Sequence, residues 1–284
     1  MRVPWYAKIV AKIILSRLPF GYSFWRRRRV FVHGSMSKPE YAWRVLREHL
    51  DQSKMLPGIE GRVVLELGPG DSVFSALIAH ALGAKRCLLV DSGNFAVREI
   101  EPYQQALDFI KSKGISISPL DSSKGLESLL NQVSGTYLTE GLTSLRRIES
   151  ESVDFVFSQA VLEHIRRSEF RATVAELRRI LRRDGKMSHE VDLKDHLGGA
   201  LNHLRFPSQL WEADWMAKSG FYTNRITFSA MLAIFEEEGF SPQIKNRIMR
   251  PAIPMARNRL AQEFRSVPEQ DLLTASFSAV FVPV

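Results

Sequence analysis

The stretch that decides the fold runs from Arg62 to Asp91 and reads RVVLELGPGDSVFSALIAHALGAKRCLLVD. Residues 62–67 form a short apolar run rich in β-branched side chains, which is typical of a buried strand. A glycine loop follows at 68–70, and apolar side chains recur at helical spacing over 72–82. Residues 86–91 form a second buried strand. A strand, a glycine loop, a helix and a strand within about 30 residues predict the βαβ unit of a parallel sheet.

The same alternation of strands and helices continues along the chain, and no internal repeat interrupts it. Helices are expected over 39–50, 72–82, 99–112, 169–183 and 227–238, and strands over 62–67, 86–91, 115–118, 153–158, 186–192, 243–248 and 276–284. Strands that alternate with helices predict an α/β fold with a Rossmann-like, doubly wound sheet.

Three parts of the chain differ in composition. Residues 1–60 are basic and aromatic and form the expected N-terminal helical extension, and residues 61–284 form the expected main domain. Within that domain, residues 194–224 have weak periodicity, so we expect an insertion that covers the site. Trp5, Ile9 and Ile13 form an apolar stripe in the extension, which predicts either a cover over the sheet or contact with a membrane surface.

Composition excludes several classes of protein. The 284 residues are 45% hydrophobic and 25% charged, as in a globular protein. Cys87 is the single cysteine, so the chain forms no internal disulfide. Charged residues interrupt the apolar stretches, so we expect no membrane span and no secretory signal, and we predict a cytoplasmic protein. The net charge is +8, with one block at residues 26–29, and the other arginine pairs are scattered, which disfavours nucleic acid as the partner.

Ligands of doubly wound sheets bind at the carboxyl ends of the strands, so the first glycine loop marks the expected site. Gly68 and Gly70 let the backbone approach a ligand closely. Asp91 ends the second strand, 21 residues after Gly70, where a carboxylate accepts hydrogen bonds from the hydroxyls of a ribose.

The loop lacks the features of a pyrophosphate site. Val73 stands where the third glycine of the dinucleotide fingerprint would be, and no Gly-Lys-Ser/Thr follows. Glu66 and Asp71 would repel a pyrophosphate. A cationic ligand that carries a ribose and no phosphate suits these residues, and S-adenosylmethionine is such a ligand.

Four segments in register resemble class I S-adenosylmethionine-dependent methyltransferases. They are the loop 66–72, Asp91, the strand segment 153–164 that ends in Leu-Glu-His, and the helix 176–181 with Asp184 and Gly185. The resemblance covers residues 62–192 and the last two strands, and Ser72 replaces the third glycine. It implies the class I fold, S-adenosylmethionine as cofactor, and a cofactor site formed by Glu66, Gly68, Gly70, Asp91, Glu140 and Ser158. Glu140 stands at a longer spacing than is usual for the adenine contact.

Residues 189–197, 202–206 and 17–36 also resemble a bacterial methyltransferase group associated with polysaccharide and glycolipid biosynthesis. This resemblance implies an acceptor that is a glycan, a glycolipid precursor or another small molecule. Cys87 has no second cysteine for covalent attack on a cytosine, and the Asn-Pro-Pro-Tyr motif of adenine methylation is absent. Both absences disfavour a nucleic-acid base as the acceptor.

Histidines and aspartates follow the fourth and fifth expected strands. His164 and His189 are the candidate bases, and Asp192 and Asp195 are the candidates to orient them, because a histidine titrates near neutral pH. Packing histidines and a polar network beneath the insertion are the structural alternatives, and the spacing matches no common metal site. We expect direct displacement onto a hydroxyl oxygen. An RNA methyltransferase and a non-catalytic scaffold are the alternatives, and the oligomeric state stays open.

Overall fold

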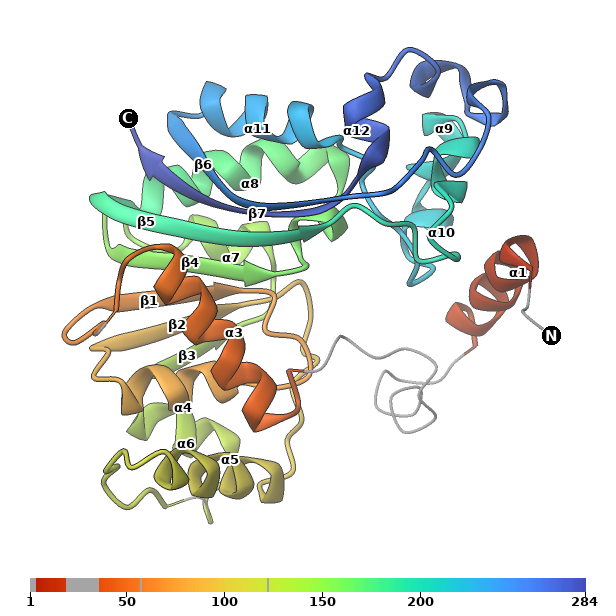
Figure 1. Cartoon of the computed structure of the whole chain (residues 1–284). Coiled ribbons are helices and arrows are strands. Elements are labelled where there is room, and N and C mark those ends of the chain that lie inside the picture. Colours follow the sequence, from red (N-terminus) through yellow and green to blue (C-terminus); the bar gives the residue numbers. More distant parts are fainter. Residues whose placement is uncertain (1–3, 19–35, 57, 122) are drawn as a thin grey trace.

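The computed structural model describes residues 4–18, 36–56, 58–121 and 123–284 (Figure 1). In this part of the chain, seven strands form one sheet in the order β3-β2-β1-β4-β5-β7-β6. The strands from β3 to β5 in this order are parallel, and β7 is antiparallel to β5 and to β6. Their bounds are β1 Val63–Leu67, β2 Arg86–Val90, β3 Gly135–Leu138, β4 Val153–Gln159, β5 Leu181–Asp192, β6 Phe240–Met249 and β7 Thr274–Pro283. The predicted doubly wound α/β fold is confirmed.

Helices cover both faces of the sheet, and each face has its own apolar core. One core includes residues of α3 (Pro39–Gln52), α4 (Phe74–Ala81), α5 (Glu101–Ser112) and α6 (Leu126–Gln132). The other includes residues of α7 (Leu142–Arg146), α8 (Arg167–Ile180) and α11 (Phe228–Glu237). Side chains alternate along β4, so Phe155 and Phe157 enter the first core and Val156 enters the second. The strands β1, β2 and β4 are therefore buried along almost their whole length.

Two expected elements differ from the structure. Residues 115–118 are not a strand: Ile115 and Ile117 are half-buried against the first core, and the third strand is β3, after α6. The helix predicted to reach residue 183 ends at Ile180, because Leu181 already pairs with Val153 in the sheet. The sheet pairing therefore overrides the helical pattern of residues 181–183.

Two segments lie beyond the carboxyl ends of the parallel strands. The first connects β5 to α11 and contains η2 (Asn202–Arg205), α9 (Ser208–Trp211) and α10 (Asp214–Ala217). The second connects β6 to β7 and contains η3 (Arg257–Arg259), η4 (Gln262–Phe264) and α12 (Glu269–Leu273). Leu204 of the first packs with Phe264 of the second. We call the first segment, residues 193–227, the cover segment.

α1 (Trp5–Ser16) lies beside the cover segment and apart from the sheet (Figure 1). Ile9 packs with Trp211 and Phe221 in a small separate core. No helix in the described part is long and apolar enough to cross a membrane. The basic block at residues 26–29 lies outside the described residues, as does most of the 17–36 resemblance.

Candidate active site

The glycine loop after β1 has a backbone that favours glycine. Gly68 and Gly70 have φ angles of +74° and +67°. The Gly68 amide donates to the carbonyl of Val90 at 2.7 Å, and the Gly70 amide donates to Asp91 Oδ2 at 2.9 Å. Asp91 Oδ1 accepts the amide of Ser92 at 2.7 Å. The structure therefore brings the predicted loop and the predicted ribose-binding carboxylate together at the ends of β1 and β2.

The segment after β4 packs closely against the same loop. A Cβ atom on Gly68 would lie 2.4 Å from Cγ2 of Val161, which is closer than real Cβ atoms approach a neighbour. Gly68 is therefore needed both for its φ angle and for this contact. The contact also places the residues that follow Val161 next to the loop.

Glu66 is a buried carboxyl at the end of β1. Burial, opposed by the Ser75 hydroxyl and supported by the charge of Asp91, raises the pKa of Glu66 to about 8. Its Oε2 atom has no hydrogen-bond partner among the described residues. A buried carboxyl oxygen without a partner is costly, and a cationic ligand beside it would favour its ionised form. This chemistry fits S-adenosylmethionine, which carries positive charge.

Glu140 and Ser158, the other two predicted cofactor residues, differ in their surroundings. The amide of Gly141, next to Glu140, donates to the carbonyl of Asp91 at 2.8 Å, so Glu140 lies at the same edge. Its exposed carboxylate pairs with Arg147 at 2.5 Å, and the adenine contact stays a prediction. Ser158 is fully buried, and its hydroxyl lies 2.7 Å from Nδ1 of His189. The structure contradicts a side-chain contact between Ser158 and the cofactor.

His189 lies inside the second core. Its ring is fully buried and packs against Phe235 and Phe281, with centroids 6.0 and 5.7 Å away. Burial lowers the pKa of His189 to about 3, with a smaller contribution from His49. The structure contradicts the predicted base role, because the side chain is enclosed in this core. It is kept away from the carboxyl ends of the parallel strands, which we call the open edge of the sheet.

His164 follows β4 in η1 (Leu162–His164) and is exposed. Its Nδ1 atom lies 2.9 Å from the carbonyl oxygen of Tyr222. A carbonyl only accepts, so Nδ1 carries the proton and, in the neutral ring, Nε2 has the lone pair. His196 of the cover segment stacks on this ring at 5.0 Å, with 3.3 Å between the two Nε2 atoms. His164 is therefore the candidate base that the structure places at the open edge.

The two predicted aspartates have different roles. The Asp195 carboxylate is buried and accepts the amides of Gly199 and Asn202, the second at 2.5 Å. It holds the start of the cover segment, which contradicts a role in orienting a base. Asp192 is half-buried, and its Oδ1 accepts the amide of Lys194 at 2.9 Å. Its predicted orienting role stays a prediction.

Glu163 is a buried carboxyl that the sequence analysis did not select. Its Oε1 accepts the amide of Asp192 at 3.2 Å, and its Oε2 has no partner among the described residues. Burial, with a smaller contribution from the charge of Asp192, raises the pKa of Glu163 to about 8. Glu163 belongs to the Leu-Glu-His segment, in which the sequence pattern indicated only the histidine as a candidate base.

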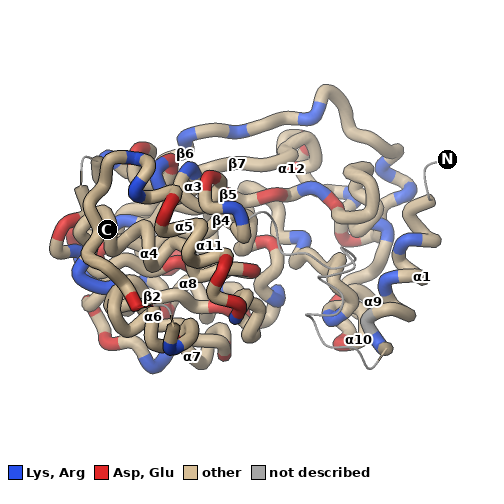
Figure 2. The backbone as a smooth tube through the Cα atoms, turned by 90° about the horizontal axis from the view of Figure 1, so that it is seen from below, with Lys and Arg blue, Asp and Glu red and all other residues tan. Residues whose placement is uncertain are grey.

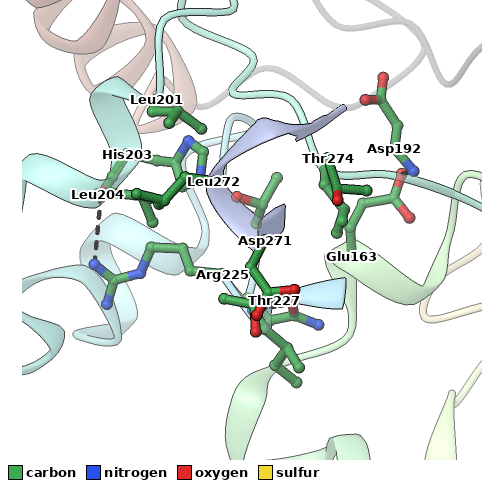
Figure 3. A pocket seen from close by; sticks show the side chains of 14 residues that line it. Glu163, Asp192, Leu201, His203, Leu204, Arg225, Thr227, Asp271, Leu272 and Thr274 are labelled. Atoms are coloured by element: carbon green, nitrogen blue, oxygen red, sulfur yellow. Dashed lines mark hydrogen bonds between the residues drawn. The ribbon is translucent and has the colours of Figure 1, made fainter. Parts of the chain in front are cut away.

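Glu163 and Asp192 line a cavity of about 30 Å³ together with His203, Thr223 and Arg225 (Figure 3). This volume has room for about one water molecule and not for a sugar. A second, larger groove of about 580 Å³ is lined by residues that include Arg167 and Phe264, and no predicted site residue lines it. A sugar acceptor would therefore have to bind outside the small cavity.

Among the described residues, no group of three or more histidine, cysteine, aspartate or glutamate side chains is placed to hold a metal ion.

The methyltransferase domain family matches residues 65–188. No curated protein sequence matches the chain significantly. The YcgJ protein of Bacillus subtilis is 18% identical, with a TM-score of 0.43 over 83% of this chain and 96% of that chain. An S-adenosylmethionine-dependent methyltransferase of Mesorhizobium loti is 16% identical, with a TM-score of 0.42 over 81% and 95%.

A third solved structure is phosphoethanolamine N-methyltransferase 2 of Haemonchus contortus in complex with S-adenosylmethionine. It is 15% identical, with a TM-score of 0.45 over 84% of this chain and 52% of that chain. The family match spans the glycine loop, Asp91 and the segment that holds His164. Residues 65–188 thus form the methyltransferase domain of an enzyme that takes its methyl group from S-adenosylmethionine.

Proposed function

We propose that the enzyme methylates a hydroxyl oxygen of a sugar, a glycolipid or a similar small molecule, with His164 as the general base. The hydrogen bond from His164 Nδ1 to the carbonyl of Tyr222 carries this proposal, because it leaves the Nε2 lone pair at the open edge of the sheet. A hydroxyl needs such a base, since it loses its proton as its oxygen is methylated.

The residues around the glycine loop would hold the cofactor. Gly68 and Gly70 allow the close backbone approach, Asp91 would accept hydrogen bonds from the ribose hydroxyls, and Glu66 would face the positive charge. When bound, S-adenosylmethionine supplies a methyl group on a positively charged sulfur, and the sulfur keeps the electron pair of the C–S bond. The protein's part is alignment, which is worth about 7–11 kcal/mol in such reactions.

The acceptor proton has a defined path. An acceptor hydroxyl that displaces His196 from its contact with His164 would meet the Nε2 lone pair. Nε2 takes the proton while the acceptor oxygen forms its bond to the methyl carbon. The carbonyl of Tyr222 then stabilises the positive ring through the Nδ1 proton. The product is a methyl ether, and the proton leaves His164 for solvent, to which the ring is exposed.

The sugar or glycolipid class of the acceptor is supported by the resemblance of residues 189–197 and 202–206. The first segment spans the end of β5 and the start of the cover segment, which carries His196, and the second lies within the cover segment. The net charge of +8 favours RNA as the alternative acceptor, because phosphates bind basic surfaces.

The acceptor class is tested with tritium-labelled methyl groups. The enzyme is incubated with labelled S-adenosylmethionine and, separately, with a bacterial lipid extract, bacterial polysaccharide and bacterial RNA. We expect label in the lipid or polysaccharide fraction, in an alkali-stable ether linkage, and no transfer by a His164→Gln variant. Label in RNA alone, or in an alkali-labile ester, contradicts the proposal. Cofactor binding without any transfer supports the scaffold alternative.

A further inference from the structure

α1 has one face that is occupied within the molecule. Trp5 and Ile13 are half-buried and Ile9 is buried, and this face packs on the aromatic core of the cover segment. Lys12 Nζ donates to the carbonyl of Gly220 at 3.3 Å. The helix is therefore seated on the cover segment and held in a fixed orientation.

The adjoining face of α1 is also apolar, and it is exposed. Tyr6, Val10 and Ile14 expose 59%, 56% and 57% of their surface, and Leu18 continues the row with 39%. Residues spaced by four lie on one side of a helix, so Tyr6, Val10 and Ile14 form a stripe, and Leu18 follows two residues after the end of the helix. A helix that covers one core normally has a polar outer face. The exposed stripe is therefore not explained by packing within the protein.

The stripe continues onto the cover segment through Trp215. This ring is 42% exposed, and the Arg17 guanidinium lies 5.9 Å from its centroid. Trp and Arg side by side are common at the boundary between lipid tails and headgroups. We call Tyr6, Val10, Ile14, Leu18 and Trp215 the exposed stripe.

The charge on α1 itself is positive: Lys8 and Lys12 lie on the helix and Arg17 follows it, whereas Asp214 precedes Trp215 in the cover segment. Residues 1–39 contain nine basic residues, at positions 2, 8, 12, 17, 26, 27, 28, 29 and 38, and no aspartate or glutamate. Figure 2 shows the basic positions along α1. Clustered positive charge beside an apolar surface is attracted to anionic lipid headgroups.

We propose that the exposed stripe docks the protein on an anionic membrane surface, with α1 lying in the plane of the interface. A helix of 12 residues is too short to cross a bilayer but long enough to bury one face in it. A second copy of the chain is the less suitable occupant, because it would bring two segments of the same positive sign together.

Docking in this orientation has a consequence for the methyl acceptor. The cover segment that seats α1 also carries His196, the residue that stacks on His164. The part of the site next to His164, where the acceptor would bind, would therefore lie near the membrane surface and face a lipid-anchored substrate. This consequence rests on the proposed function, whereas the docking itself does not.

The test is sedimentation of the purified full chain with vesicles. One set is phosphatidylcholine alone, and the other also contains phosphatidylglycerol, an anionic lipid. The wild-type protein is expected to bind the anionic vesicles, and raised salt should weaken binding. A Val10→Asp/Ile14→Asp variant should bind at least about tenfold more weakly, because it places charge in the apolar interface.

The matched control is Ile244→Asp/Ile248→Asp. Both isoleucines are exposed, at 41% and 52%, but they lie on β6, away from α1. The control variant should bind anionic vesicles like the wild type, and thermal unfolding should show that both variants fold. No binding by the wild type, equal binding to neutral and anionic vesicles, or an equal loss in both variants overturns the proposal. Conversion of a dimer to a monomer by the α1 variant, with vesicle binding unchanged, identifies a second copy as the occupant. Methyl transfer is measured separately, so failure of docking leaves the proposed activity standing.

Discussion

A His164→Ala variant is expected to lose about 10²–10⁴-fold in kcat and to keep its affinity for S-adenosylmethionine within about twofold. The loss follows because Nε2 of this ring is the base at the open edge, whereas the cofactor loop is formed by other residues. Single-turnover kinetics with a hydroxyl acceptor, together with calorimetric titration of the cofactor, separates the two effects.

His196→Ala is the matched control for this variant. It removes the ring that stacks on His164 but leaves the hydrogen bond from His164 to Tyr222 in place. We therefore expect a smaller loss in kcat than for His164→Ala, with a change in KM for the acceptor. If His164→Ala keeps a normal kcat, another group removes the proton and the assignment is wrong.

The second large effect is a maximum of stability near pH 6.5. His49, His189 and His203 are buried, and burial lowers their pKa values to about 4, 3 and 3, from 6.5. Burial raises the pKa values of Glu66 and Glu163 to about 8, from 4.5. Each group binds protons differently in the folded and unfolded states, so each makes stability depend on pH.

The direction of the change differs on the two sides of the maximum. From pH 6.5 to 8, the unfolded state has lost the two carboxyl protons that the folded state still holds, so stability falls as pH rises. From pH 6.5 to 4.5, the unfolded state gains three histidine protons and the folded state retains two extra carboxyl protons, so stability falls slowly as pH drops. Below pH 4.5 the unfolded carboxyls are protonated as well, and the fall becomes steep. For each proton by which the folded and unfolded states differ, the free energy of unfolding changes by about 1.4 kcal/mol per pH unit.

Urea unfolding at several pH values between 4 and 8 measures this profile. A Glu163→Gln variant should lose about half of the alkaline slope, because one of the two raised carboxyls is gone. An uninterrupted rise in stability from pH 6.5 to 8, in the absence of cofactor, would show that these carboxyls ionise normally.

The sequence predicted the parts of the fold in which pattern and burial agree. The βαβ unit around Gly68 is confirmed because an apolar run, a glycine loop and a helical stripe follow one another there. β3 was missed because it is a four-residue strand at the edge of the sheet, and its side chains are mostly half-buried. Residues 115–118 alternate like a strand, but β3 occupies the place beside β2.

The site was predicted less completely than the fold. The prediction of Asp91 and the glycine loop rested on their local spacing in the sequence, and the structure brings them together. The role of His189 depends on the face of the sheet toward which its ring points. The alternation of side chains along β5 places that ring in the second core. Glu163 gains its pKa shift from burial by segments distant in the sequence, such as Asn224, whose amide donates to its carbonyl. Such long-range burial is not visible in a local pattern.

Calorimetric titration with S-adenosylmethionine tests the central claim most directly. The wild type, Asp91→Ala and Asp184→Ala are compared, with NAD as a control ligand, and unfolding curves confirm that each protein is folded. Asp184 is an exposed carboxylate on β5 and serves as the matched control for the lost charge. We predict that the wild type and Asp184→Ala bind S-adenosylmethionine and not NAD, and that Asp91→Ala binds about 10–100-fold more weakly, because it loses hydrogen bonds to a charged group. Folded wild-type protein that does not bind S-adenosylmethionine, or an Asp91→Ala variant that binds it as well as the wild type, would contradict the account.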